Sequence, residues 1–151
     1  MSIDVGDRRT TGGTGRCLCG AVSYEVRVPL RDVLVCHCVE CRRWHGGPGA
    51  YTAAPRADVT LSGEASVRWI DSPESATRAR RGFCGTCGSS LFWDAPGRPV
   101  INIAAGTLDL PTGLATTRHI WTEQASDWEE LPHASTRPGG SGSEAGTAPG
   151  G

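Results

Sequence analysis

Hydrophobic and polar residues alternate with a period of two through the middle of the chain, where β-branched residues are also frequent. This alternation is typical of strands that bury one face, and no segment carries the long apolar stripe of an amphipathic helix. Glycine and proline residues separate the alternating segments and indicate turns. The pattern predicts a mainly β protein with strands at 21–28, 33–36, 50–54, 58–62, 66–70, 77–83, 90–93, 100–104 and 115–121.

The two ends of the chain lack the residues that build a core. Residues 135–151 contain no aliphatic side chain larger than alanine, and residues 1–13 are mostly polar and rich in glycine and threonine. Such segments bury too little apolar surface to offset the entropy that ordering costs. We therefore expect disordered ends at 1–13 and 135–151, around a single compact domain at 14–134.

The charge of the chain is nearly balanced. Its 15 basic residues are all arginines, and with 16 acidic residues they give a formal net charge of −1. Proteins that bind nucleic acid or an anionic membrane normally show a basic excess, so neither partner is expected. The one dense basic run, Arg78, Arg80 and Arg81, alternates with small residues and is typical of a strand face in solvent. No secretory signal or membrane-spanning segment is recognisable, which favours a cytoplasmic location.

Seven cysteines form three short clusters, which are Cys17 with Cys19, residues 36–41 (CHCVEC), and Cys84 with Cys87. Thiolates one or two residues apart can face a single ion, and zinc takes four such ligands in a tetrahedron. A disulfide framework would favour an even count in a small secreted chain. Reduced thiols that bind metal are therefore the better interpretation.

The seven thiols divide naturally as four plus three. The first and last clusters each supply two ligands, and joining them at one zinc would clamp the early strands to the late ones. Four thiolates close a structural site, whereas three leave a coordination position for water or a substrate, as in catalytic zinc. We therefore expect two Zn²⁺ ions per chain.

Several segments resemble the glutathione-dependent formaldehyde-activating enzyme family, also called the Gfa-like or centromere protein V-like family. The fold of that family resembles the Mss4 zinc-binding fold. The matching segments are 15–24 (GRCLCGAVSY), 36–42 (CHCVECR) with Gly46, 83–88 (FCGTCG) with Leu91, 106–109 (GTLD), and 119–121 (HIW) with Asp127 and Trp128.

The resemblance implies a role for each cysteine. It assigns a structural zinc to Cys17, Cys19, Cys84 and Cys87, and a second, catalytic zinc to Cys36, Cys38 and Cys41. For activity it implies a carbon–sulfur lyase or synthase that joins formaldehyde to glutathione as S-hydroxymethylglutathione. A small thiol and an aldehyde, or their adduct, are then the expected partners.

Residues beside the second cluster are candidates for substrate contact. His37 lies between two ligands and in an extended segment would point away from the metal, so it can support the ligands, act as a general base or complete the zinc site. Arg42 and Arg43 can meet the carboxylates of a glutathione-like ligand, and Gly46 shapes the following turn. Trp44 either lines a pocket or packs.

Two aromatic residues of the late segments, Trp121 and Trp128, together with His119, are expected to pack in the core or at its edge. Asp109 is expected to cap a turn rather than to take part in catalysis.

Two classes of function remain open at this point. A zinc-dependent lyase that acts on a thiol–aldehyde adduct needs the open coordination position, which the three-cysteine cluster supplies. The alternative is a non-enzymatic zinc-binding module for interaction or for carrying the adduct, which gains support if another residue completes that cluster.

Overall fold

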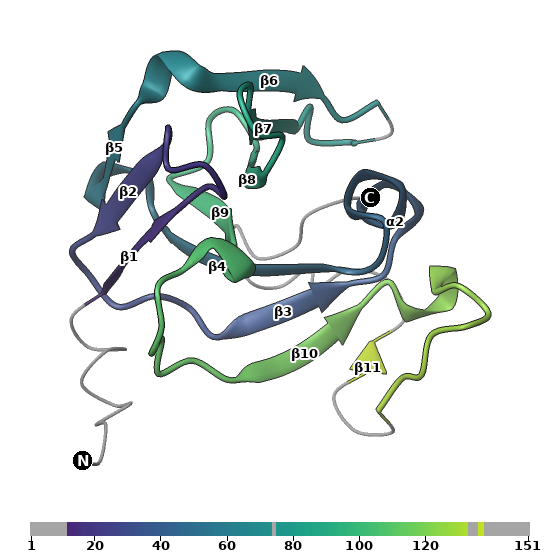
Figure 1. The fold of residues 1–151 in the computed structure, drawn as a ribbon. Coiled ribbons are helices and arrows are strands. Elements are labelled where there is room, and N and C mark those ends of the chain that lie inside the picture. The colour runs from purple at the N-terminus through teal and green to yellow at the C-terminus, as the bar shows by residue number, and fades with distance from the viewer. Residues whose placement is uncertain (1–11, 74, 133–135, 138–151) are drawn as a thin grey trace.

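The structure, a computed structural model, describes residues 12–73, 75–132 and 136–137 of the 151-residue chain. Strands dominate it (Figure 1). A three-stranded antiparallel sheet has the order β1–β2–β5, with β1 at Gly13–Arg16, β2 at Ser23–Val26 and β5 at Val59–Ser62. It packs beside a larger sheet that contains most of the strands.

The larger sheet has eight strands in the order β11–β10–β3–β4–β9–β8–β7–β6. In the same order, the bounds are Thr136–Arg137, Thr116–Ile120, Val33–Cys36, Gly49–Pro55, Val100–Ala104, Ser90–Asp94, Arg80–Cys84 and Val67–Asp71. β10 runs parallel to both β3 and β11, and the other neighbours are antiparallel. The sheet thereby places β3 and β7, which end in Cys36 and Cys84, on two sides of β4, β9 and β8.

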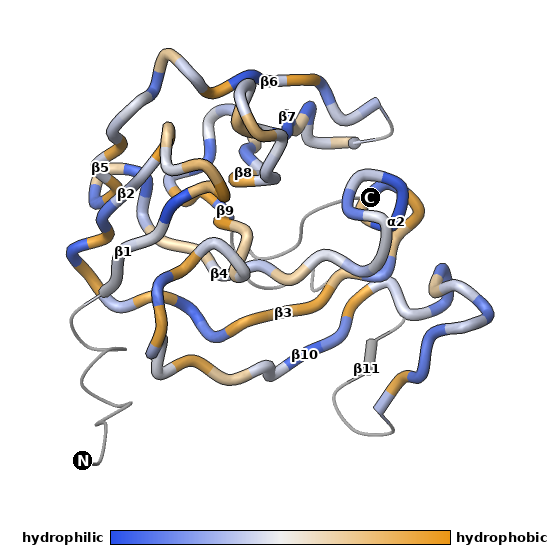
Figure 2. The backbone as a smooth tube through the Cα atoms, in the orientation of Figure 1, coloured by the Kyte–Doolittle hydropathy of each residue, from blue (hydrophilic) through white to orange (hydrophobic). Residues whose placement is uncertain are grey.

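The hydrophobic residues form two cores. One holds Val22, Tyr24, Phe92 and Ile103 together with Cys84, and the other holds a second set that includes Leu34, Tyr51, Trp93, Ile120 and the cysteines of the second cluster. Phe92 and Trp93 are neighbours in β8 and belong to different cores because successive side chains of a strand point to opposite faces. The hydrophobic stretch of β3 (VLVC) is visible in Figure 2. Each cysteine cluster therefore lies against a core of its own.

The predicted mainly β, single-domain fold is confirmed. The bounds of β3 and β9 agree with the prediction, and the other predicted strands differ at one or both ends. The largest shift is in β7, which begins at Arg80 and not at residue 77, because Arg78 lies in a turn with φ of 57° and its N–H donates to the carbonyl of Ser75.

The helix α2, Val39–His45, was not predicted. Its seven residues are too few for a recognisable apolar stripe. The thiol of Cys38 caps it by accepting from the N–H of Cys41, and Gly46 ends it in the left-handed region with φ of 75°.

The strand β1 was also missed, because its sequence, GTGR, is poor in strand formers. Gly15 is required there, since a Cβ at this position would lie 2.2 Å from the hydroxyl oxygen of Tyr24.

The expected disorder of the two ends falls mostly outside the described residues. Residues 1–11 and 138–151 are not described, whereas Gly13 begins β1 and Thr136–Arg137 form β11 beside β10. Among the described residues, no helix has the length and apolar character of a membrane span.

Candidate metal centres and the adjoining pocket

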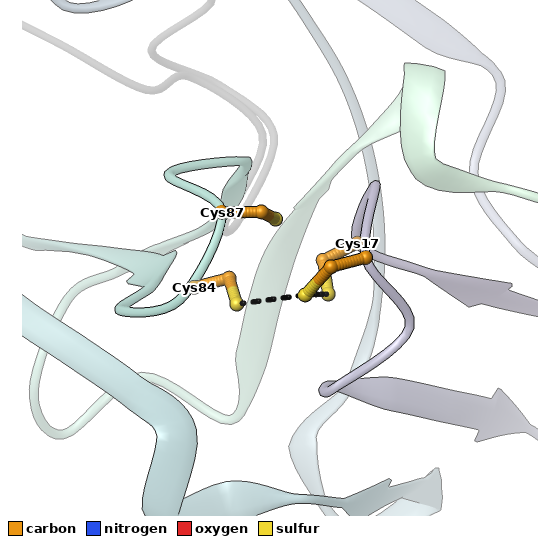
Figure 3. A group of neighbouring side chains, drawn as sticks. Cys17, Cys84 and Cys87 are labelled. Carbon is orange, nitrogen blue, oxygen red and sulfur yellow. Dashed lines mark hydrogen bonds between the residues drawn. The ribbon is translucent and has the colours of Figure 1, made fainter.

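The first cysteine cluster joins two turns that are far apart in the sequence. Cys17 and Cys19 lie in the loop after β1, Cys84 is the last residue of β7, and Cys87 lies in the turn that leads to β8. Figure 3 shows the side chains of Cys84 and Cys87 turned toward Cys17. The four sulfurs lie within 4.8 Å of one another, so the structure brings these predicted ligands together.

Backbone and hydroxyl groups hold these sulfurs in place. The N–H of Val22 donates to Sγ of Cys17 at 3.3 Å, and the N–H of Thr86 donates to Sγ of Cys84 at 3.4 Å. Ser89 ties the two turns together, because its hydroxyl accepts from the N–H of Leu18 at 2.9 Å and lies 3.2 Å from Sγ of Cys87. Such contacts orient thiolate ligands around a metal.

The spacing of the sulfurs fits a tetrahedral ion. Sγ of Cys19 lies 3.7 Å from Sγ of Cys17 and 3.8 Å from Sγ of Cys84. Metal–sulfur bonds of about 2.3 Å in a tetrahedron give sulfur–sulfur edges of about 3.8 Å. A disulfide would need sulfurs about 2.0 Å apart, and all seven cysteines are free. The donor set and its spacing therefore fit a sulfur-preferring metal ion.

The second cluster is local and buried. Cys36 ends β3, Cys38 caps α2, and Cys41 lies in the first turns of α2, each with at most 2% of its surface exposed. Their sulfurs also lie within 4.8 Å of one another, and within the described residues no histidine or carboxylate joins the group. The structure thus brings together three of the predicted ligands and no fourth.

The protonation of this cluster is uneven when it holds no cation. Hydrogen bonds from Cys36 and Cys41 hold the pKa of the Cys38 thiol far below its usual range. Burial raises the pKa of Cys36 well above its ordinary value. A divalent cation stabilises coordinating thiols as thiolates, so it would remove this imbalance. The buried cluster therefore fits a cation chemically as well as geometrically.

Arg81 on β7 is a functional candidate that the sequence analysis placed wrongly. It was expected on a solvent-facing strand, but it is buried with 2% of its surface exposed, and its Nη1 and Nη2 donate to Sγ of Cys41 at 3.6 and 3.7 Å. Its Nε donates to the hydroxyl of Ser72 at 3.1 Å, and that hydroxyl donates to Glu40 at 2.6 Å. The signal that could have identified Arg81 is the excess negative charge of three thiolates around a divalent ion, which calls for a nearby cation.

Arg80, the neighbour of Arg81, does face solvent in part. Its guanidinium stacks 4.0 Å from the centre of the Trp69 ring and pairs with Asp94 at 3.1 Å. Arg80 and Arg81 therefore lie on opposite faces of β7.

His37 points away from the second cluster, as its place between two ligands predicted. Its Nδ1 lies 2.5 Å from a carboxylate oxygen of Glu129, and its Nε2 lies 2.9 Å from Nδ1 of His119. The ring is buried and stacks on that of His119. This row of three side chains joins the end of β3 to β10 and to the loop that follows β10, so the contacts of His37 fit support of the ligand segment.

Of the tryptophans in the late segments, Trp121 packs against the second core as expected, whereas Trp128 does not pack. Trp128 has 64% of its surface exposed, so its expected position in the core or at its edge is wrong.

Asp109 contacts Thr14 through both its side chain and its backbone. Its carboxylate accepts from the hydroxyl of Thr14 at 2.7 Å, and its N–H donates to the carbonyl of Thr14, so it links β1 to a late turn.

The basic residues beside the second cluster both lie on α2. Arg43 is exposed, and Arg42 is half-buried with no hydrogen-bond partner for its Nε. Gly46 donates its N–H to the carbonyl of Arg42 and ends the helix. Both guanidinium groups are therefore carried by the helix that also holds Cys41.

A pocket of about 490 Å³ opens between the end of α2 and the turn of the first cluster. It is lined by Trp44, His45, Phe83, Gly88 and Ser90. Trp44 lines this pocket and is also fixed by packing, because its Nε1 donates to the hydroxyl of Ser90 at 2.9 Å and its ring meets Phe83 edge-on.

His45 connects this pocket to the second cluster. Its Nε2 lies 2.6 Å from the hydroxyl of Tyr51, which is wholly buried. Burial, followed by the positive charge of Arg81, lowers the pKa of His45 to about 4. Burial raises the pKa of Tyr51, and the negative charge of Cys41 raises it further. Both groups are thus neutral at pH 7, at the boundary between the pocket and the cysteines.

Comparison with known proteins gave one family. A family model described as glutathione-dependent formaldehyde-activating enzyme matches residues 13–124. A crystal structure of a protein from Rhodobacter sphaeroides is similar with a TM-score of 0.52 and 27% sequence identity, over 64% of this chain and 88% of that one. No curated protein matches the sequence.

Proposed function

We propose that this chain, which belongs to the glutathione-dependent formaldehyde-activating enzyme family, is a zinc-dependent carbon–sulfur lyase and synthase. Its substrates are a small thiol, glutathione or one like it, and formaldehyde or another aldehyde. The observation that carries the proposal is the buried group of three cysteines, to which the described residues add no fourth ligand. The reduced cysteines also support a cytoplasmic location for the protein.

Zinc is the metal that the donor sets support best. Both groups consist of thiols alone, which select zinc over magnesium or calcium, and their sulfurs are close enough for one tetrahedral ion each. Cys17, Cys19, Cys84 and Cys87 would hold a structural zinc, and Cys36, Cys38 and Cys41 a catalytic one. Zinc held by the three thiolates would supply positive charge that favours the deprotonated form of a small thiol.

The proposed reaction is the addition of a thiol to the carbonyl group of an aldehyde. The sulfur of the thiolate forms a bond to the aldehyde carbon, the π electrons of the carbonyl move to its oxygen, and that oxygen takes a proton. The proton balances the one that the thiol released, so the adduct contains all the atoms of both substrates. Lyase action is the reverse of these steps.

Residues of the chain orient the thiol and balance its charge. Arg42 and Arg43 on α2 would bind the carboxylates of a glutathione-like ligand, and Gly46 ends the helix so that the chain turns away beside them. The buried guanidinium of Arg81 would offset the net negative charge of three thiolates and one divalent ion. His37, held by Glu129 and His119, fixes the segment that carries Cys36 and Cys38, and it is a positioning residue.

Two measurements on metal-replete protein test the proposal. In cobalt-substituted protein, glutathione should strengthen the thiolate-to-metal absorption, and the Cys38→Ser variant should lose this response. The exchange of formaldehyde between its free form and its glutathione adduct, followed by NMR, should be faster with the wild type than with that variant. A spectrum that glutathione leaves unchanged, together with an unaltered exchange rate, would rule the lyase out.

The same pair of measurements separates the enzyme from a carrier. A thiol that perturbs the cobalt spectrum without any faster exchange would identify a zinc-binding carrier or interaction module.

A further inference from the structure

The pocket beside α2 has the lining of a site for an uncharged, apolar group. Its walls are the rings of Trp44 and Phe83, whose centres lie 5.6 Å apart at an interplanar angle of 71°. None of its lining residues is an aspartate, glutamate, lysine or arginine. A carboxylate or ammonium group would find no opposite charge there, whereas an aromatic or branched aliphatic group would meet ring faces and edges.

Protein atoms already satisfy polar groups of the lining. The Nε1 of Trp44 donates to Ser90, and Nε2 of His45 bonds with the hydroxyl of Tyr51. These bonds hold both rings in place before a ligand arrives, so little side-chain entropy is lost on binding. The pocket is therefore preformed and offers contact area more than hydrogen bonds.

The pocket lies one helical turn from the second cysteine cluster. Cys41 and His45 are four residues apart in α2, which places them on the same face of the helix. Tyr51 bonds to His45 and packs in the same core as Cys36, Cys38 and Cys41. His45 and Tyr51 therefore link the pocket to the three sulfurs, which do not line it themselves.

The size of the pocket exceeds what formaldehyde requires. Its volume is about 490 Å³, whereas a water molecule in the liquid takes up about 30 Å³, and formaldehyde is only slightly larger. Volumes of this order are typical of pockets for whole organic ligands.

We propose that this pocket binds the side group of the aldehyde, and that the substrates of this chain are aldehydes with an aromatic or branched aliphatic group. The inference rests on the proposed function and adds the substrate class. The thiol half, with its carboxylates, would lie toward Arg42 and Arg43 on α2, and the apolar half would enter the pocket and pack against Trp44 and Phe83.

Binding of inert thioethers tests the pocket without turnover. Isothermal titration of zinc-loaded protein should show S-benzylglutathione binding at least about tenfold more tightly than S-methylglutathione, because the benzyl ring leaves water. Trp44→Ala should remove this preference. Trp44→Phe should keep most of it, because a ring remains at the wall. Trp128→Ala is the matched control, since it removes an exposed tryptophan outside the pocket and should leave the preference unchanged.

Metal content and melting temperature of each variant show whether it has folded. If Trp44→Ala does not fold, Trp44→Phe and the wild type still decide the question. Equal binding of the two thioethers by the wild type would overturn the inference, and so would a benzyl preference that survives in folded Trp44→Ala.

Turnover separates this inference from the proposed function. With glutathione, the wild type should accelerate adduct formation from benzaldehyde and from isobutyraldehyde, and Trp44→Ala should lose that rate more than the rate with formaldehyde. Acceleration with formaldehyde alone would be consistent with the proposed lyase activity and would contradict the proposed role of the pocket. A benzyl preference without any acceleration would keep the pocket as a binding site and reject the lyase.

Discussion

Both terminal nitrogens of Arg81 donate to Sγ of Cys41, over 3.6 and 3.7 Å, in a part of the core where the arginine keeps only 2% of its surface exposed. A buried guanidinium needs a negative partner, and the Cys41 sulfur would supply one as a thiolate once a metal ion is bound. Three thiolates around a divalent ion would leave one negative charge, and Arg81 would then bring the site close to neutral as a whole. A neutral site can bind a further anionic sulfur more easily than a negatively charged site can.

Replacement of Arg81 tests this charge balance. Arg81→Met should lower the free energy of unfolding by roughly 3–5 kcal/mol, because it leaves a buried negative charge without its partner. It should also weaken glutathione binding to the cobalt-substituted protein by about tenfold or more. Arg81→Lys should recover part of both losses, since it keeps the charge and loses the paired donors. Urea unfolding and cobalt absorption measure the two effects, and unchanged glutathione binding in folded Arg81→Met would contradict the assigned role.

Zinc-replete protein should contain two metal ions per chain, because the structure gathers one group of four sulfurs and one of three. Elemental analysis of protein purified without chelator measures the ratio. A ratio near one, with all seven cysteines reduced, would reject the site with an open position unless the second ion proves to bind weakly.

Loss of the first cluster should harm folding more than loss of the second. Cys84→Ser breaks a link between segments 65 residues apart, as Cys19 and Cys84 are, whereas Cys38→Ser alters a group contained in six residues of chain. Circular dichroism and thermal melting should show the larger loss for Cys84→Ser. Equal collapse of both variants would mean that the second metal is structural too.

The buried ring of His45 should make stability depend on pH. Its pKa is about 4 in the folded protein, against an ordinary histidine value of 6.5, so the unfolded chain takes up the proton first as the pH falls. Above pH 6.5 the ring is neutral in both states and does not affect the free energy of unfolding. Between pH 6.5 and pH 4, protonation of the unfolded chain lowers the free energy of unfolding, by about 3 kcal/mol in all. His45→Gln, which can still bond to Tyr51, should show a flatter profile over this window. Metal loss in acid affects both proteins, so the difference between the two profiles isolates the histidine; identical profiles would contradict the prediction.

Local patterns in the sequence predicted most of the strands and the cysteine clusters. The features that were not predicted are short elements and features that depend on long-range packing. Cysteine spacing is a local signal, which is why the groups around Cys17 and Cys36 could be named in advance. The helix α2 is too short to show periodicity, and β1 is rich in glycine.

The burial of Arg81 and the exposure of Trp128 depend on which face of the fold each residue meets. The alternation of residues and the composition do not show which face of a strand is covered by the rest of the fold. Arg81 alternates with small residues as a solvent-facing residue would, and only the contact with Cys41, 40 positions earlier, distinguishes it.

Strand β7 contributes residues to both cysteine groups and to the pocket. Within its five residues, Arg81 touches Cys41, Phe83 lines the pocket, and Cys84 belongs to the first cluster. A ribosome delivers residues 36–41 well before Cys87, so a growing chain holds the three-cysteine group before the arginine that neutralises it. In a metal-starved cell, an empty first site would remove the link between Cys84 at the end of β7 and the loop after β1, on the same strand that carries Arg81 to the second site.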